Sequence, residues 1–212
     1  MRDGTRSRRS RPGVFPRRAP GGAGAGFTLL EIMLSLALLS VLAGAAIPLS
    51  TDVVDELRTA GAARYLAARI TGTRLHAITR STAIGLRFQP ASPDYTFRVY
   101  ADGNGNGVRS TDIQRDLDVA LGDSERLADN FPGVRFELMP DTPDVDGVRD
   151  NRVDGVRIGA ARILTMSPDG TATSGTLYLR GRRSQYAVRV LGATGRTRVL
   201  QYHTGEHTWI NR

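Results

Sequence analysis

The segment His-Thr-Gly-Glu-His at residues 203–207 has the letters of the H-x-x-E-H zinc-protease pattern. In such proteases a helix places both histidines on one face, where they bind zinc beside a general-base glutamate. The threonine and glycine of this segment do not favour a helix, and no third metal ligand is evident. No serine has the sequence context of a nucleophile elbow, and the chain contains no cysteine. We therefore expect a protein without enzymatic activity and without a cofactor.

The loop Asp-Gly-Asn-Gly-Asn-Gly fits the first half of a calcium-binding loop, because its oxygen-bearing side chains alternate and a glycine stands at the turn position. The candidate ligands are Asp102, Asn104 and Asn106. The twelfth position is Ile113, where a calcium loop requires a bidentate glutamate, and no helical pattern precedes the loop. The sequence favours a plain Asn-Gly turn, and weak calcium binding, assisted by Asp112, is the alternative.

All 29 basic residues are arginines, and they are unevenly placed. Residues 180–212 hold seven arginines and one acid, whereas residues 94–154 hold fourteen acids and seven arginines. Side chains two positions apart on a strand share a face, so part of the C-terminal set could form a phosphate-binding edge. The candidates are Arg182, Arg183, Arg196 and Arg198. The simpler interpretation is an exposed hairpin with solvated arginines, since the nearby tyrosines are too few to offer a clear stacking platform.

Glu31 stands at the head of a run of twenty uncharged residues, 32–51. As a helix this run is about 30 Å long, the thickness of the hydrocarbon core of a bilayer. A carboxylate in such a span costs up to about 3 kcal/mol on insertion scales. Glu31 therefore requires a partner or a functional reason.

The N-terminus has several interpretations. Residues 1–26 carry seven arginines and one acid with few apolar side chains, which predicts a disordered basic leader on the cytoplasmic side of a membrane. An ordinary secretory signal would be cut after Ala45, and an uncleaved signal anchor is a further possibility. Neither explains an acid at the head of the apolar run.

The apolar run continues into an amphipathic helical pattern over residues 51–82. The apolar positions on one face are Ala63, Leu66, Ile70 and Ala77. Three arginines recur every eleven residues, which predicts a nearly straight basic stripe along the helix. They are Arg58, Arg69 and Arg80.

From residue 84 the hydrophobic period changes to two. Short alternating runs are separated by glycine, proline, aspartate and asparagine, which predicts seven or eight antiparallel strands. The runs are 84–89, 95–101, 133–139, 155–160, 162–166, 175–180, 185–191 and 197–202. The predicted fold class is α+β, with a long N-terminal helix packed on a C-terminal antiparallel β-sheet domain. Its parts are a leader at 1–26, a transmembrane half-helix at 27–50, an amphipathic half-helix at 51–82 and a β-rich domain at 83–212.

The hexapeptide Gly-Phe-Thr-Leu-Leu-Glu at residues 26–31, with the apolar run behind it, resembles the class III leader of type IV prepilins and type II secretion pseudopilins. The resemblance implies that a prepilin peptidase cuts after Gly26 and methylates the new N-terminal residue, Phe27. It also implies that Glu31 pairs with the Phe27 amine of an adjacent subunit and sets the axial register of a helical filament. Ala25 precedes the cleavage glycine here, where the family commonly has lysine or arginine.

The segment at residues 167–199 resembles the closing hairpin of the type II secretion pseudopilin H and FimT family. That hairpin has a Pro-x-Gly turn, two apolar strands and a Gly-Arg-x-Arg step, which fall here at 168–170, 176–179, 186–191 and 195–198. The mid-domain loop YADGNGNGVRSTD is also similar to this family. The resemblance implies a low-abundance filament subunit with a long N-terminal helix and a β-rich C-terminal domain.

Two functions follow from this resemblance. The first is a minor pseudopilin, a structural subunit of the type II secretion pseudopilus that serves protein secretion across the outer membrane. The alternative is a FimT-type type IV minor pilin that binds DNA for natural transformation through its arginine-rich C-terminus. In both cases we expect a single-pass inner-membrane protein with a periplasmic C-terminal domain, whose partners are prepilin peptidase and other pseudopilins or pilins.

Overall fold

The structure, a computed structural model, describes residues 26–149 and 152–212, and for residues 44–50 it describes the backbone alone. The predicted leader, apart from Gly26, lies outside the described residues. The chain divides into two compact units, of which the first ends at Gly44 and the second begins at Ala45. A single helix, α1 (Leu29–Arg80), contributes to both units. The predicted helical segment is therefore confirmed.

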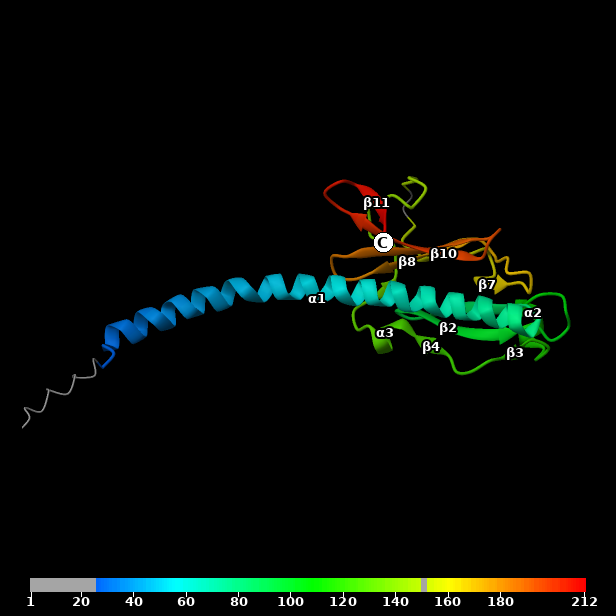
Figure 1. Ribbon diagram of the computed structural model, residues 1–212, viewed down its shortest axis with the longest axis horizontal. Coiled ribbons are helices and arrows are strands. Elements are labelled where there is room, and N and C mark those ends of the chain that lie inside the picture. Colours follow the sequence, from blue (N-terminus) through cyan, green and yellow to red (C-terminus); the bar gives the residue numbers. More distant parts are fainter. Residues whose placement is uncertain (1–25, 150–151) are drawn as a thin grey trace, which may run out of the picture. The chain divides into compact units, whose positions relative to one another are not determined.

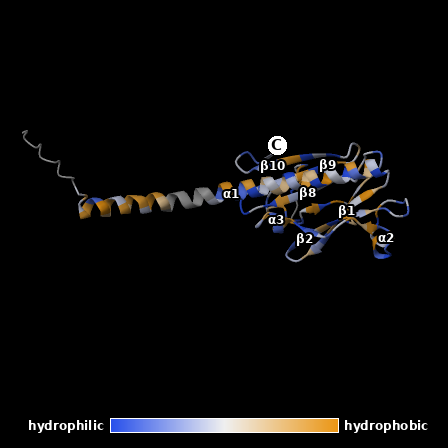
Figure 2. Ribbon diagram, turned by 60° about the horizontal axis from the view of Figure 1, so that its bottom comes forward, coloured by the Kyte–Doolittle hydropathy of each residue, from blue (hydrophilic) through white to orange (hydrophobic). Residues whose placement is uncertain are grey.

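The described part of the first unit is the beginning of α1, and most of its residues are hydrophobic (Figure 2). Its large apolar side chains are exposed around the helix, as with Leu34 and Leu38, each more than half exposed. Within the described residues, no helix combines the length and the apolarity needed to cross a bilayer.

The second unit contains two antiparallel sheets (Figure 1). In the first, the strand order is β3-β2-β1-β7, and β4 also pairs with β2. Its strands are β1 (Ile84–Ala91), β2 (Asp94–Ala101), β3 (Val119–Ala120), β4 (Glu125–Arg126) and β7 (Ile163–Met166). In the second, the order is β11-β10-β9-β8-β5, and β6 also pairs with β8. Its strands are β5 (Arg135–Phe136), β6 (Val156–Arg157), β8 (Gly175–Arg180), β9 (Gln185–Leu191), β10 (Arg196–His203) and β11 (Thr208–Asn211).

The amphipathic half of α1 packs on both sheets. Its predicted apolar positions are fully buried, namely Ala63, Leu66, Ile70 and Ala77. They share one core cluster with Leu86 of β1 and Val188 of β9. The α+β fold class is therefore confirmed, with two sheets where the sequence predicted one β-sheet domain.

The predicted basic stripe includes an ion pair at its centre. Arg58 and Arg80 are exposed, but Arg69 forms an ion pair with Glu125 of β4. The hydroxyl of Tyr65, one helical turn earlier, donates a hydrogen bond to the same carboxylate. A strand of the first sheet therefore reaches this face of the helix, which the eleven-residue spacing could not reveal.

Every predicted strand run contains a strand, but two of them, β5 and β6, are only two residues long. The sequence missed β3, β4, β11 and the short helices α2 (Ser110–Gln114) and α3 (Leu127–Asn130). Most of these elements are too short for a hydrophobic period to be visible.

Candidate functional site

The N-terminal hexapeptide forms a capped helix start. The Oγ1 of Thr28 accepts a hydrogen bond from the Glu31 N–H at 3.2 Å, and the Thr28 carbonyl accepts one from the Ile32 N–H at 3.1 Å. Thr28 is thus the N-cap, and Glu31 is the third residue of the helix. We did not predict this cap, although Thr-x-x-Glu is the sequence signature of a capping box.

The predicted cleavage residues are accessible. Gly26 is exposed, Phe27 is 77% exposed, and both precede the first helical residue. Glu31 is also exposed and makes no ion pair within the described residues. The exposure of Gly26, Phe27 and Glu31 is compatible with the predicted cleavage and pairing, which stay predictions.

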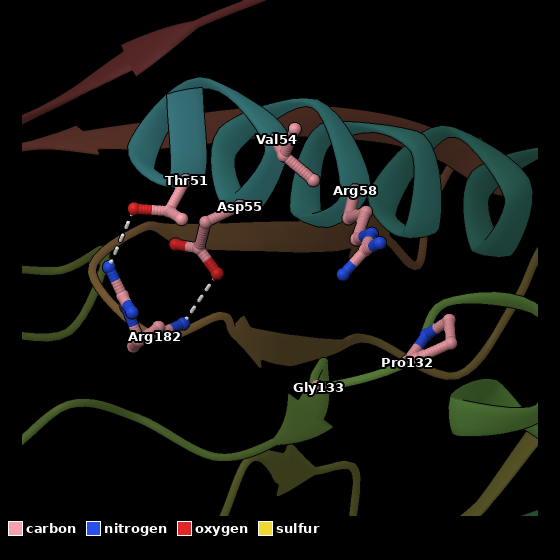
Figure 3. A pocket seen from close by; sticks show the side chains of 7 residues that line it. All are labelled: Thr51, Val54, Asp55, Arg58, Pro132, Gly133 and Arg182. Atoms are coloured by element: carbon pink, nitrogen blue, oxygen red, sulfur yellow. Dashed lines mark hydrogen bonds between the residues drawn. The ribbon is translucent and has the colours of Figure 1, made fainter. Parts of the chain in front are cut away.

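Arg182 and Arg183 lie in the turn between β8 and β9. Hydrogen bonds join this turn to α1 (Figure 3). The carboxylate of Asp55 accepts hydrogen bonds from the backbone N–H groups of Arg182 at 2.7 Å, Arg183 at 2.9 Å and Ser184 at 3.1 Å. The Ser184 hydroxyl donates a fourth hydrogen bond to it at 2.9 Å. We call this arrangement the Asp55 clasp.

The side chains of both turn arginines also have carboxylate partners. The guanidinium of Arg182 lies 3.1 Å from one oxygen of Asp52, and that of Arg183 lies 2.7 Å from the other. Burial alone would raise the pKa of Asp55, but the hydrogen bonds from the turn hold that pKa below its ordinary value of 3.8. Any other anion would have to displace these helix carboxylates.

A groove of about 430 Å³ lies beside the Asp55 clasp. Its walls are the start of the amphipathic half-helix, with Val54 and Arg58, and the loop at Pro132 and Gly133 (Figure 3).

The turn between β8 and β9 requires its glycine, because a Cβ on Gly181 would lie 2.6 Å from an oxygen of Asp55.

Arg196 and Arg198 occupy a different place, at the start of β10, where both side chains are exposed. The seven residues of β9 separate these two arginines from the Asp55 clasp. The length of that strand is about 20 Å. The four predicted DNA-binding arginines therefore form two separate pairs. One pair is held by helix carboxylates, and the other lines a groove of about 550 Å³ together with Arg74 of α1.

Arg74 joins two parts of the predicted closing hairpin. Its Nε donates a hydrogen bond to the Gly170 carbonyl at 2.8 Å. Gly195, which begins the Gly-Arg-x-Arg step, is buried against the same guanidinium and the same carbonyl. The glycines of the Pro-x-Gly turn and of the Gly-Arg-x-Arg step thus meet around one helix side chain, a contact that the sequence did not reveal.

Gly195→Ala is expected to lower the free energy of unfolding by about 2–3 kcal/mol. Gly195 has φ +59°, and a Cβ there would lie 2.6 Å from Arg74 Nε and overlap the Gly170 carbonyl oxygen. The measurement is urea unfolding of the full chain in detergent. The matched control is Gly205→Ala, because a Cβ at Gly205 meets nothing within 4 Å. Equal stability of both variants would contradict the packing described.

The candidate calcium loop is held by its own carboxylates. Asp102 accepts hydrogen bonds from three backbone N–H groups of the loop at 2.7–3.0 Å, and Asp112 accepts from the side-chain amides of Asn104 and Asn106. Burial would raise the pKa of Asp102, but the N–H groups lower it below the ordinary value. Asp118, which we did not single out, accepts two further backbone hydrogen bonds. Calcium binding stays a prediction, and the observed contacts explain these residues as supports of the loop.

The His-Thr-Gly-Glu-His segment lies where β10 and β11 form a hairpin, not on a helix. Nδ1 of His207 lies 3.3 Å from the Tyr202 hydroxyl, and Nε2 of His203 lies 3.2 Å from the Arg212 guanidinium. In the part of the chain that the structure describes, no group of three or more acidic or histidine side chains is arranged to hold a metal ion.

Comparison with known proteins points to the N-terminus. The chain matches the prokaryotic N-terminal methylation motif over residues 24–47. The pilin-like protein PilA1 of Thermus thermophilus is 40% identical over 82 residues, which are 38% of this chain and 50% of PilA1. The chain thus spans about half the length of this curated relative, and no solved structure matches it. The protein carries the N-terminal methylation motif of type IV pilin-like proteins, with Glu31 inside it, on a helix that continues into an α+β domain.

Proposed function

We propose that the protein is a minor pseudopilin, a structural subunit of a type II secretion pseudopilus. The observation that carries the proposal is the methylation motif at 24–47, which includes the Gly26–Phe27 junction and Glu31. In this account prepilin peptidase cuts after Gly26 and methylates Phe27. The protein acts as a structural component, and its partners are other filament subunits.

The helix start gives Glu31 a physical role in this account. Cleavage creates an ammonium group on Phe27, one residue before the N-cap Thr28. The N-terminus of a helix already has partial positive charge, so an added cation there is unfavourable. A carboxylate at the third helical position offsets that charge, and a neighbouring subunit can supply the same pairing in trans.

Membrane anchoring belongs to the same proposal. It is supported by the methylation motif and by the uncharged run at 32–51. The described part of α1 does not by itself satisfy the requirements for a membrane span, so the proposal depends on these two observations. The leader would lie in the cytoplasm and the β-rich domain in the periplasm.

Deletion of the gene tests the choice of secretion machinery. We expect exported proteins to disappear from the culture medium and to return with a plasmid copy, while transformation frequency stays unchanged. Normal export together with a loss of transformation would favour the alternative function.

The alternative is a FimT-type minor pilin that binds DNA through its arginine-rich C-terminus. The observation that favours it is the groove at the start of β10, where the described lining residues include three arginines and three threonines but no carboxylate. Arg196, Arg198 and Arg74 would contact backbone phosphates without reading sequence.

Salt dependence tests this alternative quantitatively. Three phosphate contacts predict that log K for duplex DNA falls with log salt concentration at a slope of about −2.7, and each arginine removed reduces the slope by about 0.9. The measurement is a titration of the full chain in detergent at several salt concentrations. Unchanged affinity in Arg196→Ala/Arg198→Ala would exclude this site. A steeper slope that depends on Arg182 and Arg183 would mean that their ion pairs with Asp52 break when DNA binds.

A further inference from the structure

The first half of β10 is an open sheet edge. Strand β9 pairs with residues 196–201 on one side, whereas β11 pairs on the other side only with residues 200–203. Among the described residues, no strand pairs with the outer side of residues 196–198. An open edge of this kind can accept an added strand.

One hydrogen bond shows to which side the backbone N–H and carbonyl groups point at this edge. The Arg212 N–H donates to the Val199 carbonyl at 2.9 Å, so the polar groups of Val199 point away from β9. The direction of backbone polar groups alternates along a strand, so residues two apart point to the same side. Thr197 therefore directs its N–H and its carbonyl toward the open side.

The open edge borders the groove of about 550 Å³, whose opposite wall is α1 with Thr71 and Arg74. Arg198 stands directly opposite Arg189 of β9, and like charges in this position repel. Arg189 is neutralised by Asp146 at 2.6 Å. Arg196 and Arg198, in contrast, pair with no carboxylate within the described part of the chain.

We propose that this edge binds an extended acidic polypeptide segment of another protein, which adds as a strand beside β10. The outward N–H and carbonyl of Thr197 would form the backbone pairing. Arg196 and Arg198 are two residues apart and share one face, so they select carboxylates at alternate positions of the added segment. The positive edge also opposes unwanted pairing between two copies of this same edge, because both copies would present arginines.

A polypeptide fits this edge better than a nucleic acid does. DNA phosphates would engage the arginines but would leave the outward backbone groups of Thr197 unused. The residues that line the groove include no aromatic side chain on which bases could stack.

The test uses the full chain in detergent with a blocked heptapeptide in which aspartate alternates with threonine. The control is the same peptide with lysine in place of aspartate, and a short DNA duplex is titrated in parallel. Thr197→Pro removes the outward N–H but is tolerated at an edge, and Thr197→Ala is the matched control because it keeps that N–H. We expect Thr197→Pro to weaken binding of the acidic peptide about tenfold or more and Thr197→Ala to leave it unchanged.

Two further measurements keep the test decisive if Thr197→Pro fails to fold. Amide exchange at Thr197 in the unmodified protein should slow when the acidic peptide is added. Arg196→Glu/Arg198→Glu should reverse the preference toward the lysine peptide. Equal peptide affinity in Thr197→Pro and Thr197→Ala would overturn strand addition. Binding of the duplex without the acidic peptide would assign the groove to phosphate, and binding of neither would also overturn the proposal.

Discussion

Glu31→Ala is expected to abolish filament assembly while membrane insertion and cleavage after Gly26 continue. In the assembled filament, Glu31 would lie beside the Phe27 ammonium of an adjacent subunit, away from water. Removing one member of a buried ion pair costs about 3–5 kcal/mol, because the other charge stays buried without a partner. That penalty at each contact corresponds to a loss of about two to four powers of ten in affinity. The measurement is the amount of protein in sheared, sedimented filaments relative to the membrane fraction.

Glu31→Gln tests the negative charge of Glu31 separately from the place of this residue in the helix N-cap. Glutamine can occupy the third position of a capping box, so the helix start at Thr28 would be kept. It has no negative charge to pair with the Phe27 ammonium. We expect Glu31→Gln to fail in assembly as Glu31→Ala does. Normal filaments from the glutamine variant would mean that Glu31 serves only to start the helix.

Asp55→Ala is expected to lower the free energy of unfolding by about 3 kcal/mol, which for a chain of this size corresponds to about 6–12 °C in Tm. The substitution removes the acceptor of four hydrogen bonds, three of them from consecutive backbone N–H groups of the β8–β9 turn. The measurement is a thermal melt of the full chain in detergent. Asp52→Ala is the matched control, since the ion pairs of Asp52 with described residues are surface pairs with two exposed arginines, and such pairs contribute at most about 1 kcal/mol. Equal losses in the two variants would contradict the Asp55 clasp.

The same clasp predicts a pH dependence. The pKa of Asp55 is lower in the folded protein than its ordinary value of 3.8, so the folded state favours the ionised carboxylate. This contribution is fully present above pH 3.8 and is lost as the pH falls through the lower, folded-state pKa. The stability difference between the native chain and Asp55→Ala should therefore be largest near neutral pH and shrink below about pH 4.

Periodicity predicted the helix and the main strands because these elements bury whole faces. Leu66 and Ile70 repeat at helical spacing and are fully buried, and the alternating run at 185–191 became β9. The two-residue strands β3 and β4 carry no such signal. Their positions depend on tertiary contacts, such as the Glu125 carboxylate that meets Tyr65 and Arg69 of α1.

The candidate site was predictable where it is local and unpredictable where it is built from distant segments. Gly26, Phe27 and Glu31 lie within six residues, so a motif could include all three, and their roles in cleavage and assembly stay predictions. The arginine set could not be resolved from sequence, because Asp55 is far from Arg182 along the chain and the hydrogen bonds between them form only in the fold. Sequence also gave no reason to place Arg74 beside the Gly-Arg-x-Arg step.

Mass spectrometry of the mature N-terminus tests the central claim most directly. The measurement is made on the protein purified from the membranes of a host that has a prepilin peptidase. The account predicts a chain that begins at Phe27 with a methylated α-amino group. A mature chain that begins at Ala46, or one that keeps residues 1–26, would contradict it.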